Sequence, residues 1–441
     1  MSAAVVAAAL VLSACTGSSG GAAPRATSSA KVSAASRQTA CRAAVHEVVA
    51  ATQRYVDVYS DVGLTTTPSG GSGTAATTPS ATASPSASGS VQGSDADSTL
   101  QHAIATATRI RRTQGCDPTT FNSGLTTGLA QVTSHGAVAG AVLRQLRANL
   151  TGQVATDPTT VHVAPGDDLA AALATAATGS TLQLAAGTYA LSDALVLLRG
   201  VTLAGAGAGQ TTITSTATDA ALLVLTGDRV ALRGLALRRT GPAVGSVLVG
   251  GSAASLQLAG VAVSGARLGS TGGGAGILMT AGSGQVADGS TTLEVTDSTF
   301  SANQGAGIAL TGAHRGSIVS SRFTGNGQCG VCFLDASGGA VRTSEFTRNA
   351  AGIAVAATAR PLVVGNHLSG GQVGVQAVDH AAPVLRGNTV TGASRAAVIW
   401  SGQSGGRADR TTCKADRYGL VVASTAHPFL GHNACPVAQS K

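Results

Sequence analysis

The chain has 441 residues, of which 44% are hydrophobic and only 2% aromatic, so any core must be built from Ala, Val, Leu and Ile side chains. The formal net charge is +8, from 28 basic and 20 acidic residues. Because the basic residues form no long run and few aromatics lie between them, we expect no nucleic-acid partner. An acidic polysaccharide or an anionic lipid surface is compatible with this charge.

The N-terminal residues carry a short apolar stretch at 5–12, too short to span a bilayer, followed by Leu12-Ser13-Ala14-Cys15 and a Gly/Ser-rich run. This segment resembles the lipobox of bacterial lipoproteins, although no Lys or Arg precedes the apolar stretch. The resemblance implies a signal peptide over 1–14, lipidation of Cys15 and a flexible tether over 15–38. It also implies a lipid anchor on the extracytoplasmic face of the cell membrane. The alternative is an apolar leader with a chance cysteine.

Residues 39–151 are predicted to form about four helices, because apolar side chains recur there at helical spacing. Asp117-Pro118 indicates the start of one helix, since aspartate caps helices and proline fits the first turn. An insert over 64–97, rich in Thr, Ser, Pro and Gly, is expected to be disordered. No catalytic motif is visible in this region, which suits a spacer or a cap for the domain that follows.

The C-terminal part of the chain repeats every 22 or 23 residues. One column of apolar residues comprises Phe300, Phe323, Phe346, Leu368, Val390, Cys413 and Cys435. A second column keeps the same spacing, and glycine precedes every member except Val398: Ile308, Val331, Ile353, Val375, Val398 and Leu420. Repeats of this length, made of short β-rich segments, indicate a solenoid in which each repeat is one coil.

The segment before these repeats holds a short helical pattern at 168–173 and a glycine-rich run at 200–207, and later coils contain Gly365-Asn366 and Gly387-Asn388. These features resemble right-handed parallel β-helix proteins of the pectin lyase-like superfamily, in which a short helix caps the solenoid. The resemblance covers about 160–435. It implies an all-β fold, a right-handed parallel β-helix preceded by a small α-helical region.

Asparagines recur at one turn of the repeat. Asn303, Asn326 and Asn349 each lie three residues after a phenylalanine of the first column. A buried asparagine tolerates left-handed turn geometry and bonds to its equivalents in neighbouring coils, so we expect a structural role for them.

Six cysteines remain besides the lipobox cysteine, an even number that suits disulfides in an oxidising compartment. Cys413 and Cys435 share a column one coil apart, where adjacent strands are about 4.8 Å from each other, so we predict a disulfide between them. The remaining pairs are Cys41 with Cys116 and Cys329 with Cys332. The last pair is a C-x-x-C without the context of a redox or zinc site, and it is expected to be a local disulfide or two unreactive thiols.

Ionisable side chains gather on one turn of the aligned coils. This strip comprises His314, Arg315, Asp335, Arg360, Asp379, His380 and His427. If the strip is catalytic, Asp335 and Asp379 are the acid and base, or calcium ligands. His380 is an alternative base, and Arg360 would bind a carboxylate.

The substrate-binding candidates of the strip are His314, Arg315 and His427. About eight extra residues over 280–292 suit a loop that walls a groove beside it. The alternative is that these polar residues only solvate the turns of a solenoid.

Polysaccharide lyases of the superfamily cluster acidic calcium ligands with a catalytic arginine, and its hydrolases carry closely spaced aspartates. The sequence shows neither cluster, so no metal site is predicted, and calcium is expected only if the protein is lyase-like. The oligomeric state and the ligand stay open.

Three functions follow as hypotheses. The first is a cell-surface lipoprotein whose β-helix binds an envelope or environmental polysaccharide. The second is a polysaccharide lyase, epimerase or glycoside hydrolase that acts through the strip. The third is a non-catalytic scaffold or adhesion spacer. Fold analogy by itself does not choose among them.

Overall fold

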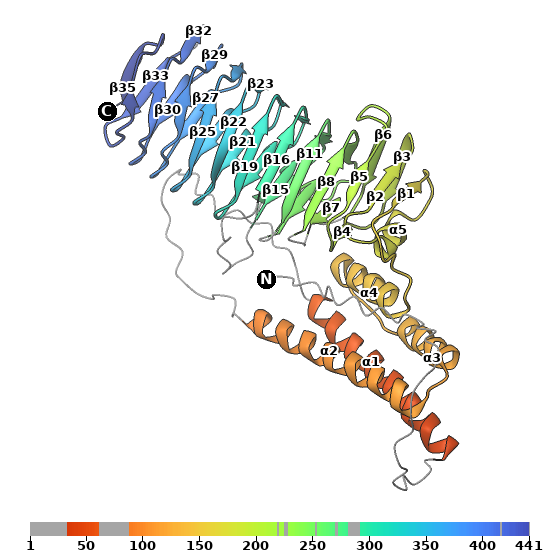
Figure 1. Cartoon of the computed structure of the whole chain (residues 1–441). Coiled ribbons are helices and arrows are strands. Elements are labelled where there is room, and N and C mark those ends of the chain that lie inside the picture. Colours follow the sequence, from red (N-terminus) through yellow and green to blue (C-terminus); the bar gives the residue numbers. More distant parts are fainter. Residues whose placement is uncertain are drawn as a thin grey trace, which may run out of the picture. The chain divides into compact units, whose positions relative to one another are not determined.

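The computed structural model describes residues 33–60, 88–217, 220–224, 228–251, 254–269, 272–280, 292–414 and 417–440 (Figure 1). Two compact units are present, a helical unit that ends at Thr156 and a β-rich unit that begins at Asp157. The signal peptide, Cys15 and most of the predicted tether lie outside the described residues, as do 64–87 of the insert and 281–291 of the extra loop. Within the described part of the chain, none of the helices combines the length and the apolar character needed to span a membrane.

The helical unit contains α1 (Ala34–Ser60), α2 (Ser88–Gln114), α3 (Pro118–Ala130) and α4 (Ala137–Leu150). The predicted start of α3 is confirmed, since the Asp117 carboxylate accepts a hydrogen bond of 2.7 Å from the Thr120 backbone N–H. The buried side chains of the helical unit include Val48, Val56, Leu100, Phe121 and Leu129.

Two helices begin earlier than the sequence predicts. Helix α1 begins inside the expected tether, and α2 begins at Ser88, ten residues inside the insert that was expected to be disordered. The added residues of α1 are mostly good helix formers such as Ala, Arg and Gln, whereas those of α2 are mostly poor ones such as Gly, Ser and Asp. In both helices these residues extend a helix that the following amphipathic segment nucleates. Extension is easier than nucleation, because each residue that is fixed gains one backbone hydrogen bond.

The β-rich unit winds through three parallel sheets, here named A, B and C, and a short helix, α5 (Leu169–Thr175), follows its first strand. Among the described residues, sheet A has twelve strands in the order β1 (Thr160–Val163), β2 (Thr181–Leu184), β5 (Thr202–Ala204), β8 (Arg229–Arg233), β11 (Ser255–Ala259), β16 (Thr292–Thr296), β19 (Arg315–Val319), β22 (Gly338–Arg342), β25 (Arg360–Val364), β28 (Val384–Arg386), β31 (Arg407–Asp409) and β34 (Phe429–Leu430).

Sheets B and C run beside sheet A along the solenoid. The ten described strands of sheet B are β3 (Gly187–Leu191), β6 (Thr211–Ser215), β9 (Ala236–Arg239), β12 (Ala262–Ser264), β17 (Thr299–Ser301), β20 (Arg322–Thr324), β23 (Glu345–Thr347), β26 (His367–Ser369), β29 (Thr389–Thr391) and β32 (Thr412–Lys414). The eleven described strands of sheet C are β4 (Leu195–Leu197), β7 (Leu222–Val224), β10 (Leu248–Gly250), β15 (Ile277–Met279), β18 (Ile308–Leu310), β21 (Cys329–Phe333), β24 (Ala351–Val355), β27 (Val373–Ala377), β30 (Ala396–Trp400), β33 (Leu420–Ala423) and β35 (Val437–Ser440). A small antiparallel hairpin, β13 (Leu268–Gly269) and β14 (Gly272–Gly273), lies apart from these sheets.

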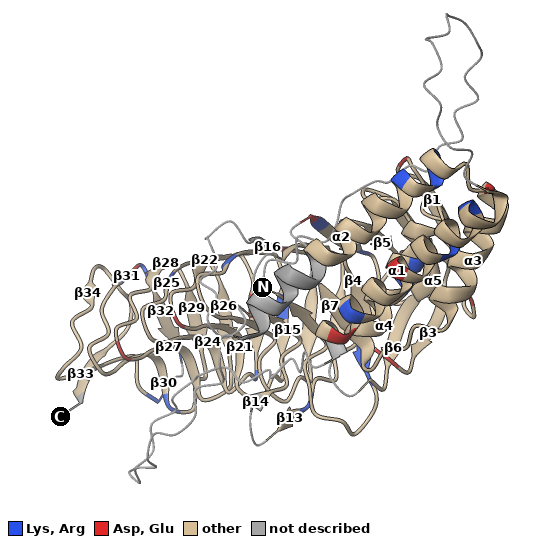
Figure 2. Ribbon diagram, turned by 90° about the horizontal axis from the view of Figure 1, so that it is seen from below, with Lys and Arg blue, Asp and Glu red and all other residues tan. Residues whose placement is uncertain are grey.

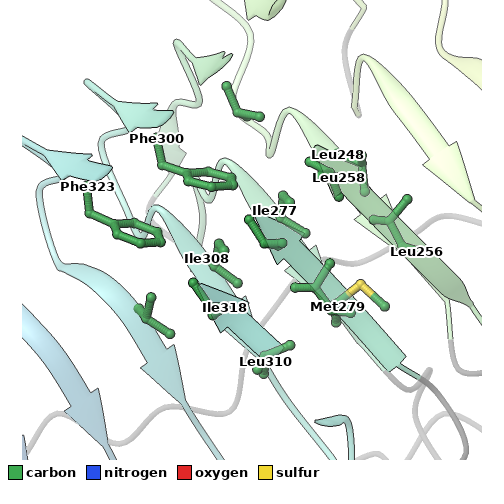
Figure 3. Close-up of a cluster of buried hydrophobic side chains, with 14 of the residues drawn as sticks. Leu248, Leu256, Leu258, Ile277, Met279, Phe300, Ile308, Leu310, Ile318 and Phe323 are labelled. Atoms are coloured by element: carbon green, nitrogen blue, oxygen red, sulfur yellow. The ribbon is translucent and has the colours of Figure 1, made fainter. Parts of the chain in front are cut away.

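Each coil of the repeat region passes from sheet B to sheet C and then to sheet A. The two predicted columns are confirmed, since Phe300 pairs with Phe323 in sheet B and Ile308 pairs with Val331 in sheet C. The inward-facing side chains form one continuous apolar core along the solenoid (Figure 3). Phe300 and Phe323 stack with ring centroids 5.0 Å apart, and Phe346 continues the stack.

The glycines of the second column are required by lack of space. A Cβ built on Gly330 would lie 2.5 Å from Cδ1 of Phe346 and 2.7 Å from the backbone oxygen of Gly352. Gly307 and Gly352 are confined in the same way by the first-column residue of the next coil. The glycine therefore makes room for the large side chain of its neighbour.

The asparagines form a buried ladder, as predicted. The Asn303 side-chain amide donates to Oδ1 of Asn326 over 2.9 Å, and the Asn326 amide donates to Oδ1 of Asn349 over 2.8 Å. A second ladder runs through another turn, where Asn366 donates to Asn388 over 3.0 Å. Each asparagine also bonds to backbone atoms of a neighbouring coil, so the turns are tied together where the strands end.

Three disulfides are present: Cys41–Cys116, Cys413–Cys435 and Cys329–Cys332, the last being one of the two states expected for that pair. The Cys413 and Cys435 Cα atoms are 5.0 Å apart, in agreement with the spacing of adjacent coils. This bond links the last two members of the first column.

Replacing Gly330 by alanine should destabilise the solenoid, because the new methyl group would overlap Phe346 and the backbone of the next coil. We expect a loss of about 1–3 kcal/mol, as for other overpacked cores, seen as a lower midpoint in thermal or denaturant unfolding. Gly209→Ala is the matched control, since a Cβ there meets nothing within 4 Å. Equal unfolding midpoints for the two variants would contradict this account of the glycine column.

Candidate functional site

The seven strip residues lie where each coil passes from sheet C to sheet A. We call this turn the C–A corner, and it comprises residues 311–314, 334–337, 356–359, 378–381, 401–404 and 423–426 in successive coils. Asp335, Asp379 and His380 lie in the turn itself. Arg315, Arg360 and His427 lie at the beginning of the sheet A segment that follows. The alignment of the coils is therefore confirmed.

Asp335 and Asp379 occupy the same position two coils apart, and both have left-handed backbone, with φ of 57° and 59°. Gly312, Ala357 and Gly402 have positive φ at the same position of other coils, whereas Ser424 in the last of these coils does not. Each carboxylate binds the coil before it. Oδ2 of Asp335 accepts from the Gly312 N–H over 2.8 Å, and Oδ2 of Asp379 accepts from the Ala357 N–H over 3.4 Å. Aspartate suits this corner because its short side chain tolerates left-handed geometry.

His314 does not belong to the exposed strip that the sequence predicts. Its side chain is fully buried, and Nδ1 lies 2.6 Å from the Thr311 carbonyl oxygen, to which it donates. Among the described residues, its Nε2 atom has no hydrogen-bond partner. The equivalent residues of the next coils are also buried and small: Ser337, Ala359, Ala381, Ser404 and Ala426. This is the inward-facing position of the turn, which alignment by sequence spacing does not reveal.

The remaining strip residues lie apart from one another, and all of them are exposed except Asp335, which is half-buried. Arg315, Arg360 and His427 share one outward position, with Gly338 between the two arginines. The arginines are thus two strands apart, about 9.6 Å at the backbone. Among the described residues, no hydrogen bond or ion pair joins any two of the seven, and no group of three or more His, Cys, Asp or Glu side chains converges as metal ligands would.

A row of arginines on the outer face of sheet A is the feature that the sequence reasoning missed. Five consecutive strands, from β19 to β31, each carry one exposed arginine, and together they define the arginine face: Arg315, Arg342, Arg360, Arg386 and Arg407. Arg342 and Arg386 share a second outward position, four residues along the strand from that of Arg315 and Arg360. The two columns are therefore about 13 Å apart along the strands. The sequence does contain a signal, because Arg315 and Arg360 are 45 residues apart and Arg342 and Arg386 are 44 apart, which is two coils in each case. The two pairs alternate along the chain, and this hides the spacing.

The arginine face has little acidic compensation. In these five fully described strands, Asp409 is the one outward carboxylate, and it lies 3.7 Å from Nη2 of Arg407 while accepting a hydrogen bond from the His432 N–H. The guanidinium of Arg407 also packs 4.9 Å from the ring centre of Phe429, which is 60% exposed. The other four arginines have no ion-pair partner among the described residues. The face therefore presents free cations on a rigid sheet.

Residues 271–428 match the family model for the right-handed beta helix region. Together with the three parallel sheets, this match confirms the predicted fold class, an all-β right-handed parallel β-helix preceded by a helical region. No curated protein matches the chain.

Solved structures with the same fold are distant in sequence. The catalytic domain of a GH87 alpha-1,3-glucanase in complex with tetrasaccharides is 13% identical, with a TM-score of 0.50 over 64% of this chain and 59% of that one. The tailspike protein 2 of bacteriophage CBA120 is 10% identical, with a TM-score of 0.46 over 61% of this chain and 47% of that one. The chain thus spans less than two thirds of either structure. The first similarity supports the fold alone, and the second is too weak to support an argument.

The hydrogen bond from Gly312 to Asp335 predicts how this turn responds to substitution. Asp335→Ala should lower the free energy of unfolding by about 1–2 kcal/mol, because the Gly312 N–H loses its acceptor. Asp335→Asn should stay close to the wild type, since asparagine keeps an acceptor oxygen and tolerates left-handed backbone. Denaturant unfolding measures both, and equal losses for the two variants would contradict the turn role.

Proposed function

We propose that the protein binds an acidic glycan along the arginine face of sheet A while a lipid at Cys15 anchors it to the extracytoplasmic face of the cell membrane. The observation that carries the glycan part is the presence of one exposed arginine on each of five neighbouring strands with a single carboxylate among them. This proposal keeps the first of the three hypotheses and adds the acidic character of the ligand.

Guanidinium groups suit a ligand of this kind. Arginine binds carboxylate and phosphate through two parallel hydrogen bonds and stays charged at all physiological pH values. The sheet holds the arginines at repeated spacings, so a linear polymer with regularly placed anions can meet several of them at once. Once one anionic group of the polymer is bound, each further contact with an arginine forms within the same complex, where the effective concentration of the polymer's anionic groups is high.

The positions of the aromatic side chains also favour binding of a glycan through its charge over binding through stacked sugar rings. Trp400 is fully buried and cannot meet a sugar ring, and Phe429 is the exposed aromatic nearest the arginine face. Neutral sugars are usually held by aromatic platforms. The similarity to a glucanase domain that holds tetrasaccharides supports only the capacity of such a solenoid to present an extended face to a linear sugar.

A catalytic role through Asp335 and Asp379 is the second candidate. Their positions two strands apart, about 9.6 Å at the backbone, border the arginine face and do not exclude a pair of carboxylates that act on a glycosidic bond. Both carboxylates already accept backbone hydrogen bonds from the preceding coil, and this structural role accounts for the aspartates at these positions without catalysis. Product formation from the bound glycan, with or without calcium, that Asp335→Asn and Asp379→Asn abolish would favour the enzyme.

Removing two arginines from the face should weaken glycan binding. On an array of acidic and neutral glycans, the wild type should retain uronate-containing or phosphate-containing chains, and Arg342→Gln with Arg386→Gln should weaken that binding about tenfold or more. Binding should also fall as salt is raised, since exposed charges are screened.

The matched control for this experiment is Arg348→Gln with Arg395→Gln, which removes the same charge from exposed positions between sheets B and C. It should bind as the wild type does. Preference for neutral glycans, or equal losses in both double variants, would overturn the assignment of the arginine face.

The lipid anchor makes a separate prediction. Cys15→Ser should remove the site of acylation and move the protein from the membrane fraction to the soluble extracytoplasmic fraction, while thermal unfolding of the β-helix stays unchanged. Fractionation followed by mass analysis of the N-terminal peptide measures this. Wild-type protein without a lipid at Cys15 would remove this part of the proposal and leave the glycan part standing.

A further inference from the structure

We propose that the disulfide-linked end of the α1 and α2 pair is a docking surface for anionic lipid headgroups. We call it the basic end, and it comprises Arg37, Arg42, Arg109, Arg111 and Arg112. Figure 2 shows basic positions on both helices. The choice of a lipid over a soluble polyanion rests on the lipid anchor proposed above, but the surface itself is separate from the arginine face.

The Cys41–Cys116 disulfide gathers these residues. Its Cα atoms are 5.9 Å apart, so the first turns of α1 lie beside the C-terminal end of α2. Arg37 and Arg42 are within four residues of Cys41, and the three arginines of α2 are within seven residues of Cys116. At 1.5 Å per residue along a helix, all five therefore lie within roughly 10 Å of the disulfide along the helix axes.

The basic end is exposed and uncompensated. Four of the five side chains are exposed, and Arg111 is half-buried. Among the residues described for this unit, none of the five guanidinium groups has an ion-pair or hydrogen-bond partner. The nearest carboxylates in sequence are Asp117 and Glu47. Asp117, five residues after Arg112, is engaged as the cap of α3. Glu47 is exposed five residues after Arg42 and forms no ion pair with the arginines described here.

Helix stability does not account for all of these charges. Arg111 and Arg112 lie in the last turn of α2, where a cation interacts favourably with the helix dipole. Arg37 lies in the first turn of α1, which contains no acidic residue, and there the dipole disfavours a cation. An anionic partner outside the helices would compensate for this repulsion.

The position along the chain points to a membrane as that partner. Helix α1 begins at Ala34, 19 residues after Cys15. A segment of that length reaches at most about 65 Å, so a lipid at Cys15 would hold the start of α1 within that distance of the bilayer surface. A basic patch beside a lipid anchor adds attraction for acidic headgroups, by about fivefold in partitioning for each arginine near the surface.

Vesicle binding by the chain from Thr16 onward, which keeps every described residue but cannot be acylated, tests this inference apart from the anchor. We expect it to co-sediment with phosphatidylglycerol vesicles and not with phosphatidylcholine vesicles, and to be released by salt. Replacing Arg37, Arg42, Arg109 and Arg112 by glutamine should lower this binding at least tenfold. These positions are exposed and glutamine is a good helix former, so circular dichroism should be unchanged.

The matched control removes the same charge from the arginine face: Arg315→Gln, Arg342→Gln, Arg360→Gln and Arg386→Gln. It should keep vesicle binding and lose acidic-glycan binding, and the helical variant should do the reverse. Equal loss of vesicle binding in both variants would show a response to net charge only and overturn the inference. Failure of the wild-type protein to bind the acidic vesicles would also overturn the inference about the basic end. The result of the glycan-binding assay would not be affected.

Discussion

Register between neighbouring coils is the constraint on which the rest of the solenoid depends. In the repeat region each strand pairs in parallel with the strand of the next coil, as Phe300 does with Phe323 and Arg322 with Glu345. Successive side chains of a strand point to opposite faces, so a slip of one residue would turn the core outward. The glycine column and the asparagine ladders oppose such a slip. The glycines leave room for the first-column side chain of the next coil, and the asparagine side chains bond to the equivalent asparagines and to the backbone of neighbouring coils.

The same register organises the outer surface. Once the inward positions of sheet A are fixed, the outward positions of consecutive strands fall into columns at the strand spacing. Arginines placed in these columns are held by the sheet backbone and not by a loop, which lowers the conformational entropy lost on binding an extended anion. A surface of this kind needs no pocket, because a linear polymer can lie across several coils.

Backbone geometry at the corners explains why polar residues gather there. One position of the C–A corner is left-handed in coil after coil, and glycine, aspartate and alanine fill it. Asp335 and Asp379 are thus suited to the turn before any chemistry is considered, and their hydrogen bonds to the preceding coil are part of its structure. Aligned ionisable residues in a solenoid therefore need a second observation, such as unpaired charge, before they indicate a ligand.

The sequence by itself determined the coil length, the two inward columns, the asparagine ladder and the Cys413–Cys435 pair, because each is a periodic pattern that can be read along the chain. The Cys41–Cys116 pair, 75 residues apart, followed only as a remaining pair. The sequence also placed Asp335, Asp379 and His380 correctly at one turn. Only the tertiary structure showed that His314 faces inward, because the direction of a side chain at a corner depends on backbone dihedrals that spacing does not encode. The arginine face likewise became visible only in the folded sheet. Arg315 and Arg360 share one column, Arg342 and Arg386 share another, and Arg407 lies in a third. Residues that are 18 to 27 positions apart become neighbours when parallel strands bring them to one surface.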